Sequence, residues 1–278
     1  MHAEARRIAV VTHGGAGNRK ANEDGCAVAA QAAMRRLRAG EDALAAAVDA
    51  VVALEDDPRF NAGTGSILRS DRRTIECDAS VMDSRGRLGA VACLQAVKNP
   101  VLVARRVVET RHWLLAGTGA IEFAREQGFA EHALKGHAQA RGGGGAGSDA
   151  SQEACDTVGA VTLDADGHFA VACSTGGSAP ALRGRVGDTP IPGAGFWVGA
   201  HGAVAVTGVG EMIVPRMLAR TVYDWIERGM PLAQALERGV ALLPDDSDVG
   251  LIGLARGEAA AASNRSMPFH IVEHGPQD

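Results

Sequence analysis

Four short polar clusters in the second half of the chain carry residue types suited to nucleophilic catalysis. They are Asp156-Thr157-Val158-Gly159, Ser174-Thr175-Gly176-Gly177, Gly184-Arg185-Val186-Gly187-Asp188 and Thr207-Gly208-Val209-Gly210-Glu211. Thr157 stands out, because cleavage of the bond between Asp156 and Thr157 would give it a free amino group. That amine, with an ordinary pKa of about 7.7 to 8.0, would lie beside the hydroxyl and could accept its proton. One residue would then supply both nucleophile and base.

The other clusters have chemistry suited to binding an amino-acid head group. Arg185 offers a planar fork for a carboxylate, and Asp188 three residues later can accept hydrogen bonds from an ammonium group. Thr207-Gly208 ends an apolar segment just before a predicted helix, where backbone N–H groups can stabilise a developing oxyanion. Taken singly, each feature has an ordinary structural explanation: a strand threonine, a surface ion pair or a helix cap.

Local patterns predict the elements that must position these residues. Two hairpins are expected, one with its turn at 83–86 and one with its turn at 164–167. The second hairpin would bring Thr157 and Thr175, at its opposite ends, to the same sheet edge. Helices are expected over 24–39, 41–54, from Pro100, and over 120–127, 211–228 and 232–243, and further strands over 8–11, 203–206, 249–255 and 269–272.

Strands and helices arranged in blocks favour an α+β fold of stacked antiparallel sheets with helical layers. The segment at about 131–155 contains the glycine run Gly142–Gly145 and has the composition of a flexible linker. The chain of 278 residues is 46% hydrophobic, enough for a sizeable core in one large domain or two small ones.

Composition also narrows the class of partner. The formal charge of -5 comes from interspersed signs, which argues against nucleic acid or an anionic membrane and favours a small solute. The five cysteines include no CxxC pair and are expected to be buried or free thiols in a reducing compartment. No secretory h-region and no apolar stretch of about 20 residues is found, so we expect a soluble, cytoplasmic protein.

The motifs, in their order, resemble those of the plant-type asparaginase and isoaspartyl peptidase family of N-terminal nucleophile hydrolases. The similarity runs over nearly the whole chain and includes residues 12–17, 60–65, 78–83 and 207–208. It implies a four-layer αββα sandwich in a single domain, 1–278, made as an inactive precursor. Self-cleavage between Asp156 and Thr157 would give an α chain (1–156) and a β chain (157–278), and two such pairs would form a dimer of heterodimers.

The resemblance also implies catalytic roles for individual residues. Thr157 would be the nucleophile and Thr175 would hydrogen-bond to it. Thr207 and the Gly208 amide would form the oxyanion hole, and Asn61 would help to orient the nucleophile. The implied reaction is hydrolysis of L-asparagine and β-aspartyl peptides with no catalytic cofactor.

Substrate and ion binding are implied in the same way. Arg185 would hold the substrate α-carboxylate, and Asp188 with the Gly208–Gly210 loop would hold its α-amino group. A loop of backbone carbonyls would surround a structural sodium ion, contributed by Leu54, Glu55, Asp57, Phe60, Ala62 and Thr64.

Two departures from the family pattern bear on function. Asp156 stands where many asparaginases have glycine before the scissile bond, and Val209 stands where close relatives often have a second threonine. A glycosylasparaginase-like amidase and a taspase-like threonine endopeptidase are the alternatives within the enzymes. The lack of a signal peptide and of paired cysteines argues against the first, and the second needs room for a protein substrate. A nucleotide-binding protein is disfavoured because the glycine-rich loops lack a GK[ST] sequence, and a catalytically inactive scaffold would remain uncut.

Overall fold

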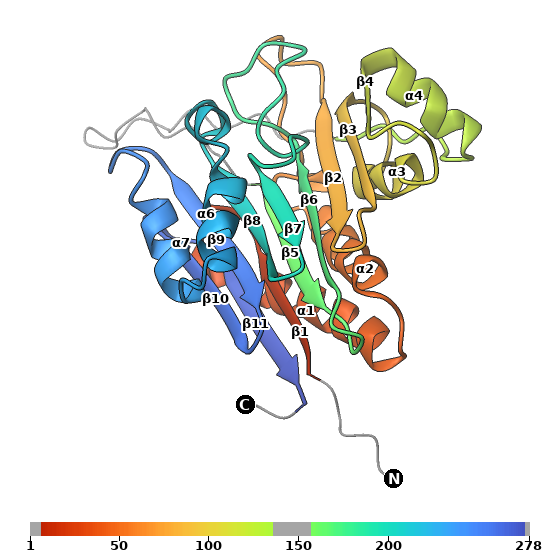
Figure 1. Cartoon of the computed structure of the whole chain (residues 1–278). Helices are drawn as coiled ribbons and strands as arrows, with labels where there is room; N and C mark the ends of the chain where they lie inside the picture. The colour runs from red at the N-terminus through yellow and green to blue at the C-terminus, as the bar shows by residue number, and fades with distance from the viewer. Residues whose placement is uncertain (1–6, 136–156, 276–278) are drawn as a thin grey trace.

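The computed structural model, which describes residues 7–135 and 157–275, is a mixed α+β structure with two β-sheets (Figure 1). One sheet has seven strands in the order β11-β1-β5-β6-β2-β3-β4, and the other has four in the order β10-β9-β8-β7. Only the pair β3–β4 is parallel among the paired strands of this part of the chain. The strands are β1 Ile8–His13, β2 Cys77–Asp83, β3 Leu88–Leu94, β4 Leu114–Ala116, β5 Val158–Leu163, β6 Phe169–Thr175, β7 Phe196–Gly199, β8 Gly202–Gly208, β9 Val249–Ala255, β10 Glu258–Ser263 and β11 Phe269–His274.

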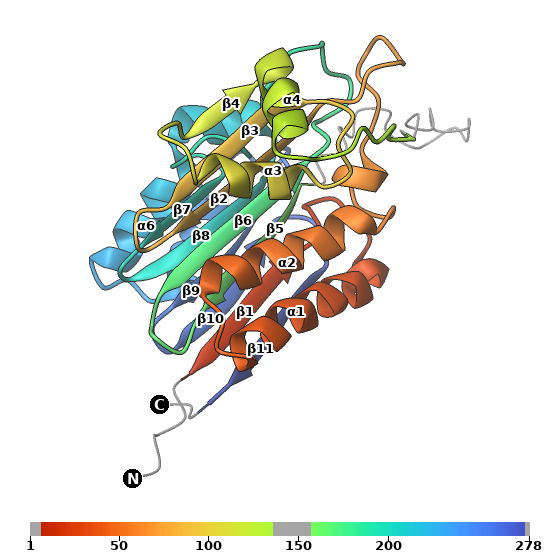
Figure 2. The ribbon, with the colours of Figure 1, turned by 90° about the vertical axis from the view of Figure 1, so that its right-hand side faces the viewer.

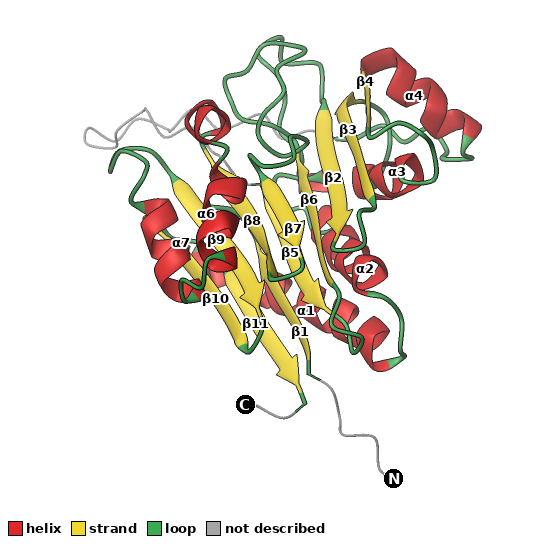
Figure 3. Cartoon of the chain, viewed as in Figure 1, coloured by secondary structure: helices red, strands yellow, loops and turns green. Residues whose placement is uncertain are grey.

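Helices pack against both sheets. The helices are α1 Glu23–Arg38, α2 Ala43–Asp56, α3 Pro100–Val107, α4 Gly117–Glu126, α5 Gly210–Ile213, α6 Leu218–Glu227 and α7 Leu232–Val240, with 3-10 turns at Lys20–Asn22, Gly63–Gly65 and Val214–Arg216. Helices α1 and α2 lie along the seven-stranded sheet (Figure 2). Helices α6 and α7 lie over the four-stranded sheet (Figure 3).

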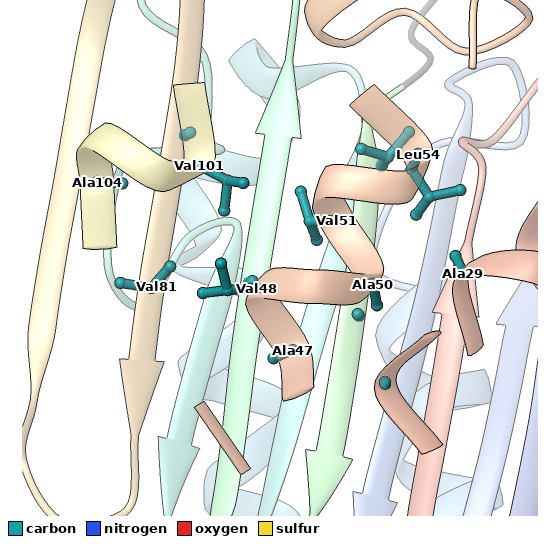
Figure 4. Close-up of a cluster of buried hydrophobic side chains, with 14 of the residues drawn as sticks. Ala29, Ala47, Val48, Ala50, Val51, Leu54, Val81, Val101 and Ala104 are labelled. Carbon is teal, nitrogen blue, oxygen red and sulfur yellow. The ribbon is translucent and has the colours of Figure 1, made fainter. Parts of the chain in front are cut away.

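Small aliphatic side chains fill the space between helices and sheets. In the cluster shown in Figure 4, Val48 and Val51 of α2 lie near Val81 of β2 and Val101 of α3. A separate buried cluster joins the two sheets and includes Val171 of β6, Phe196 of β7 and Ile252 of β9. With aromatic residues at only 4% of the chain, Ala, Val, Leu and Ile supply most of the core.

Both predicted hairpins are confirmed. Strands β5 and β6 pair antiparallel, and the turn between them is held by Asp164, whose carboxylate accepts hydrogen bonds from the N–H groups of Asp166 and His168. Gly167 in the same turn has a φ of 82°, a conformation that glycine adopts without strain. Residues 131–135 of the predicted linker form neither helix nor strand, and the rest of it, with Asp156, lies outside the described residues.

The single helix predicted over 211–228 is wrong. The segment forms α5, a 3-10 turn and then α6, because Pro215 has no N–H to continue the helix and Met217 adopts a left-handed conformation with φ of 43°. Strands β4, β7 and β10 were not predicted. The sequence of β10, Glu-Ala-Ala-Ala-Ala-Ser, has the composition of a helix, but pairing with β9 overrides that propensity.

The described residues also bear on the predictions about cysteines and membrane-spanning helices. Their four cysteines, Cys26, Cys77, Cys93 and Cys173, are free and buried, as predicted. Burial raises the pKa of Cys26 and Cys77 to about 12, so these thiols stay protonated at neutral pH. None of the helices in the described ranges is both long and apolar enough to cross a membrane.

Candidate active site

The hairpin of β5 and β6 brings Thr157 and Thr175 together. Val158 pairs with Ser174 in the antiparallel register, so the next residue outward on each strand is a threonine. Both threonines are buried and line the same pocket. The predicted meeting of the two threonines at one sheet edge is confirmed.

The pocket gathers most of the residues singled out by their chemistry. Its lining comprises Thr157, Thr175, Gly177, Ser178, Arg185, Gly187, Asp188, Thr189 and Gly208. Ser178 and Thr189 were not predicted as site residues. The cavity has a volume of about 10 Å³, which is close to the space that one water molecule needs. It adjoins a wider hollow of about 570 Å³ that shares Ser178 and Arg185 with it.

The hydroxyl of Thr157 lies 3.5 Å from that of Thr189. Thr189 follows Asp188 directly, and that adjacency is the only sequence signal that could have identified it. The Thr175 hydroxyl accepts a hydrogen bond from the N–H of Gly177 at 3.0 Å. The bond between Thr175 and Thr157 that the resemblance implies stays a prediction, because in the described residues each hydroxyl has a different partner.

Asn61 lies beside the turn that follows Thr175. Its side-chain nitrogen donates to the carbonyl of Gly177 at 2.6 Å, and its backbone carbonyl accepts from the N–H of Gly176 at 2.8 Å. Its side-chain oxygen accepts from the N–H of Ile67 at 3.1 Å. Asn61 therefore acts on the pocket through the Gly176–Gly177 turn.

Arg185 is paired with Glu211, a partner that the sequence did not reveal. The Arg185 Nε and Nη2 atoms donate to the two Glu211 carboxylate oxygens at 3.0 and 2.8 Å. Burial disfavours the charged guanidinium, but the bond to Glu211 outweighs it and the pKa of Arg185 is raised. This pairing engages one edge of the fork, and the Nη1 atom at its other end remains for a second anion.

Asp188 is a buried carboxylate with an unused acceptor. Its side chain is 3% exposed, and its Oδ2 atom has no hydrogen-bond partner among the residues that the structure describes. Burial raises the pKa of Asp188 to about 7. A Cβ at Gly210 would come within 3.1 Å of the Asp188 Oδ1 atom and 2.9 Å of the Arg185 Nη2 atom, so only glycine leaves both groups their space.

Thr207 and Gly208 end strand β8 beside the pocket. Gly208 lines the pocket, and Thr207 is fully buried directly before it. The Thr207 hydroxyl accepts a hydrogen bond at 3.3 Å from the N–H of Ala16, in the glycine-rich loop after β1. Gly208 has a φ of 144°, and a Cβ there would lie 2.2 Å from the Asp248 carbonyl oxygen, which excludes any larger residue.

The sequence was then compared with known proteins. Residues 6–277 match the family model described as Asparaginase. The chain belongs to the asparaginase family. It is 39% identical to a plant-type L-asparaginase of Pyrobaculum calidifontis, over 92% of this chain and 93% of the relative. It is also 39% identical to an isoaspartyl peptidase/L-asparaginase of Danio rerio, over 96% and 92%, and 37% identical to one of Rattus norvegicus, over 96% and 87%.

The loop after α2 is the place where this asparaginase-family chain would hold the implied sodium ion. A Cβ at Gly63 would lie 2.7 Å from the Glu55 carbonyl oxygen, and one at Gly65 would lie 2.0 Å from the Phe60 carbonyl oxygen. Carbonyl oxygens therefore crowd against two glycines with no side chain between them. Oxygen donors of this kind suit a hard cation, and the sodium site at this loop stays a prediction.

Proposed function

We propose that the chain is an isoaspartyl peptidase and L-asparaginase that hydrolyses β-aspartyl dipeptides and L-asparagine. One observation carries this proposal: Thr157, Arg185, Asp188 and Gly208 line the same pocket. A hydroxyl nucleophile thus faces a cation and a carboxylate that complement the two charges of an aspartyl head group. The names of the relatives from Danio rerio and Rattus norvegicus support the same activity.

The proposed active form arises by self-cleavage before Thr157. The chain would then consist of an α chain, 1–156, and a β chain, 157–278, within one domain of the αββα sandwich type. The burial of Thr157 in the pocket, directly after Asp156 in the chain, is consistent with a bond that must be cut before the Thr157 amine can act. Association of two such pairs into a dimer of heterodimers is part of the proposal.

In the proposed reaction, the Thr157 hydroxyl attacks the side-chain carbonyl of the substrate and its freed amine takes the hydroxyl proton. The oxyanion that forms is stabilised by the Thr207 hydroxyl and the Gly208 amide. The amine then protonates the leaving group, which departs as ammonia or as an amino acid. Water hydrolyses the resulting β-aspartyl ester and regenerates Thr157.

Recognition of the head group depends on the two charged residues of the pocket. Arg185 would bind the α-carboxylate through the end of its fork that Glu211 leaves free. Asp188 would accept hydrogen bonds from the α-ammonium group through its Oδ2 atom. Substrate binding would give that buried oxygen a charge-assisted partner.

The sodium ion has a structural part in this proposal. The backbone carbonyls of Glu55 and Phe60 would help to hold it, and Asn61 follows Phe60 directly. When bound, the ion supplies positive charge that stabilises the carbonyl-rich loop. The Asn61 side chain, which donates to Gly177 at 2.6 Å, would then keep the turn after Thr175 in place.

Two measurements test the proposal. Intact mass spectrometry of the purified protein should give two polypeptides that join at Asp156 and Thr157. β-Asp-Leu, L-asparagine and a glycosylated asparagine should then be assayed side by side, and we expect turnover of the first two. Turnover of the glycosylated substrate alone would establish the glycosylasparaginase-like alternative. An uncut chain that hydrolyses β-aspartyl bonds at full rate would contradict the proposed nucleophile.

A further inference from the structure

Arg69 is a buried cation outside the pocket. It lies in the segment before β2, and its side chain is fully shielded from solvent. Its Nε atom lies 3.3 Å from a carboxylate oxygen of Glu76, which is an ion-pair distance without the geometry of a hydrogen bond. Burying a charged guanidinium costs free energy, and the contacts of Arg69 must offset that cost. Those contacts therefore indicate its role.

Arg69 and Glu76 together hold the backbone of the segment that carries Arg185. The Arg69 Nη2 atom donates to the Arg185 carbonyl at 3.3 Å and to the Glu76 carbonyl at 3.0 Å. A Glu76 carboxylate oxygen accepts from the N–H of Gly184 at 2.7 Å. Arg69 and Glu76 therefore bind the Gly184 N–H group and the Arg185 carbonyl group. These two contacts fix the orientation of the backbone from which the Arg185 side chain extends.

The same guanidinium packs under the turn that follows Thr175. Gly177 has a φ of 87°, and a Cβ at this position would lie 2.2 Å from the Arg69 Nη1 atom. Gly177 also lines the pocket and its carbonyl accepts from Asn61. Arg69 thus contacts both backbone segments that border the pocket, one carrying Thr175 and the other carrying Arg185.

We propose that Arg69 is a positioning residue for substrate recognition, because it fixes the backbone from which Arg185 reaches the substrate carboxylate. This inference rests on the proposed function, since it acts through the role given to Arg185. A lysine at position 69 keeps the positive charge but has no planar fork, so it cannot hold Glu76 and the Arg185 carbonyl together. Substrate affinity should therefore change more than the chemical step.

The first experiment compares Arg69→Lys with Arg125→Lys. Arg125 is a matched control, because it also donates to two backbone carbonyls, those of Phe129 and Ala96, but lies away from the pocket. For Arg69→Lys we expect KM for β-Asp-Leu to rise about tenfold while kcat stays within about twofold and self-cleavage is complete. Arg125→Lys should leave both constants unchanged. A lower melting temperature with unchanged KM would overturn the inference.

A double-mutant cycle with Arg185→Lys then tests the route of the effect. If Arg69 acts through Arg185, its substitution should raise KM much less in the Arg185→Lys background than in the wild type. Equal effects in both backgrounds would overturn the inference. If Arg69→Lys does not fold, the same double-mutant cycle is run with Glu76→Gln, because this change weakens the hydrogen bond from the Gly184 N–H group. A wild-type chain that hydrolyses neither substrate would refute the proposed function itself.

Discussion

The two sides of the pocket are built by different means. On the nucleophile side, Thr157 and Thr175 lie at the ends of β5 and β6, where the hydrogen bonds of a central pair of strands set their positions. On the head-group side, Arg185 and Asp188 lie in a segment that is neither helix nor strand. That segment is held by buried charged side chains, including Arg69. Reacting groups are thus placed by the sheet, and recognition groups by electrostatic contacts.

The two sides of the pocket should also differ in the groups that titrate near neutral pH. Burial raises the pKa of Asp188 to about 7 and that of Asp78 to about 6. Asp78 accepts a hydrogen bond from the N–H of Gly187 at 3.4 Å, so it belongs to the head-group side. On the nucleophile side the hydroxyls of Thr157 and Thr175 stay uncharged, and the group that titrates there is the proposed free amine of Thr157, with an ordinary pKa of about 7.7 to 8.0. Substrate affinity should therefore depend on pH through the acidic groups, and the chemical step through the amine.

The largest expected effect comes from removing the nucleophile. Thr157→Ala should abolish self-cleavage and lower turnover by at least about 10⁴-fold, because the hydroxyl and its neighbouring amine are both lost. Intact mass and ammonia release measure the two effects. Thr162→Ala on the same strand is the control: it removes a buried hydrogen bond to the Ala43 carbonyl but should leave cleavage intact. A cleaved and active Thr157→Ala protein would show that Thr157 is not the nucleophile, and the proposed difference between the two sides of the pocket would be wrong.

The second largest effect is expected at the oxyanion hole. Thr207→Val keeps the shape of the side chain but removes the hydroxyl that is proposed to stabilise the oxyanion. We expect kcat to fall about 100-fold to 1,000-fold, with a much smaller change in KM. Steady-state kinetics with L-asparagine, on protein whose cleavage has been verified by mass, measure this effect. An unchanged kcat would show that the Thr207 hydroxyl, which accepts a hydrogen bond from Ala16, does not stabilise the oxyanion.

Loss of the head-group cation should have the opposite kinetic signature. Arg185→Ala is expected to raise KM for L-asparagine about 100-fold, because a buried charge-assisted contact to the carboxylate disappears. Self-cleavage should be spared, since it needs no substrate carboxylate. Arg183→Ala, at a side chain that is 63% exposed, should change KM by less than about twofold. A loss of cleavage in Arg185→Ala would show that the two sides are not independent.

The smallest effect is the pH dependence of KM. Below a pKa of about 7 Asp188 is mostly protonated and neutral, and above it the carboxylate can attract the substrate ammonium group. KM should therefore fall by roughly eightfold from pH 6 to pH 7.5, following the ionised fraction. Asp188→Asn should have a high KM with no such slope. A slope that persists in Asp188→Asn would assign the titration to another group, such as Asp78.

Sequence patterns were most informative where structure is local. The hairpin of β5 and β6 was predicted because two strand-like segments flank an Asp-Gly turn, with Thr157 and Thr175 only 18 positions apart. The break in the helix after Ile213 was missed, although Pro215 is a local signal for it. Thr189 was missed although it directly follows Asp188, and Arg69 had no such signal, because its contacts join distant parts of the chain.

By itself, the sequence determined the identity and order of the chemical groups: a threonine at a potential cleavage site, a cation and a carboxylate three residues apart, and a threonine-glycine pair at a strand end. Tertiary structure decided which charges are buried and which are paired. It brought Glu211 to Arg185, left an Asp188 oxygen without a partner among the described residues, and enclosed Arg69 beneath two loops. Desolvation and pairing depend on everything packed around a group, and much of that packing comes from residues far away in the chain.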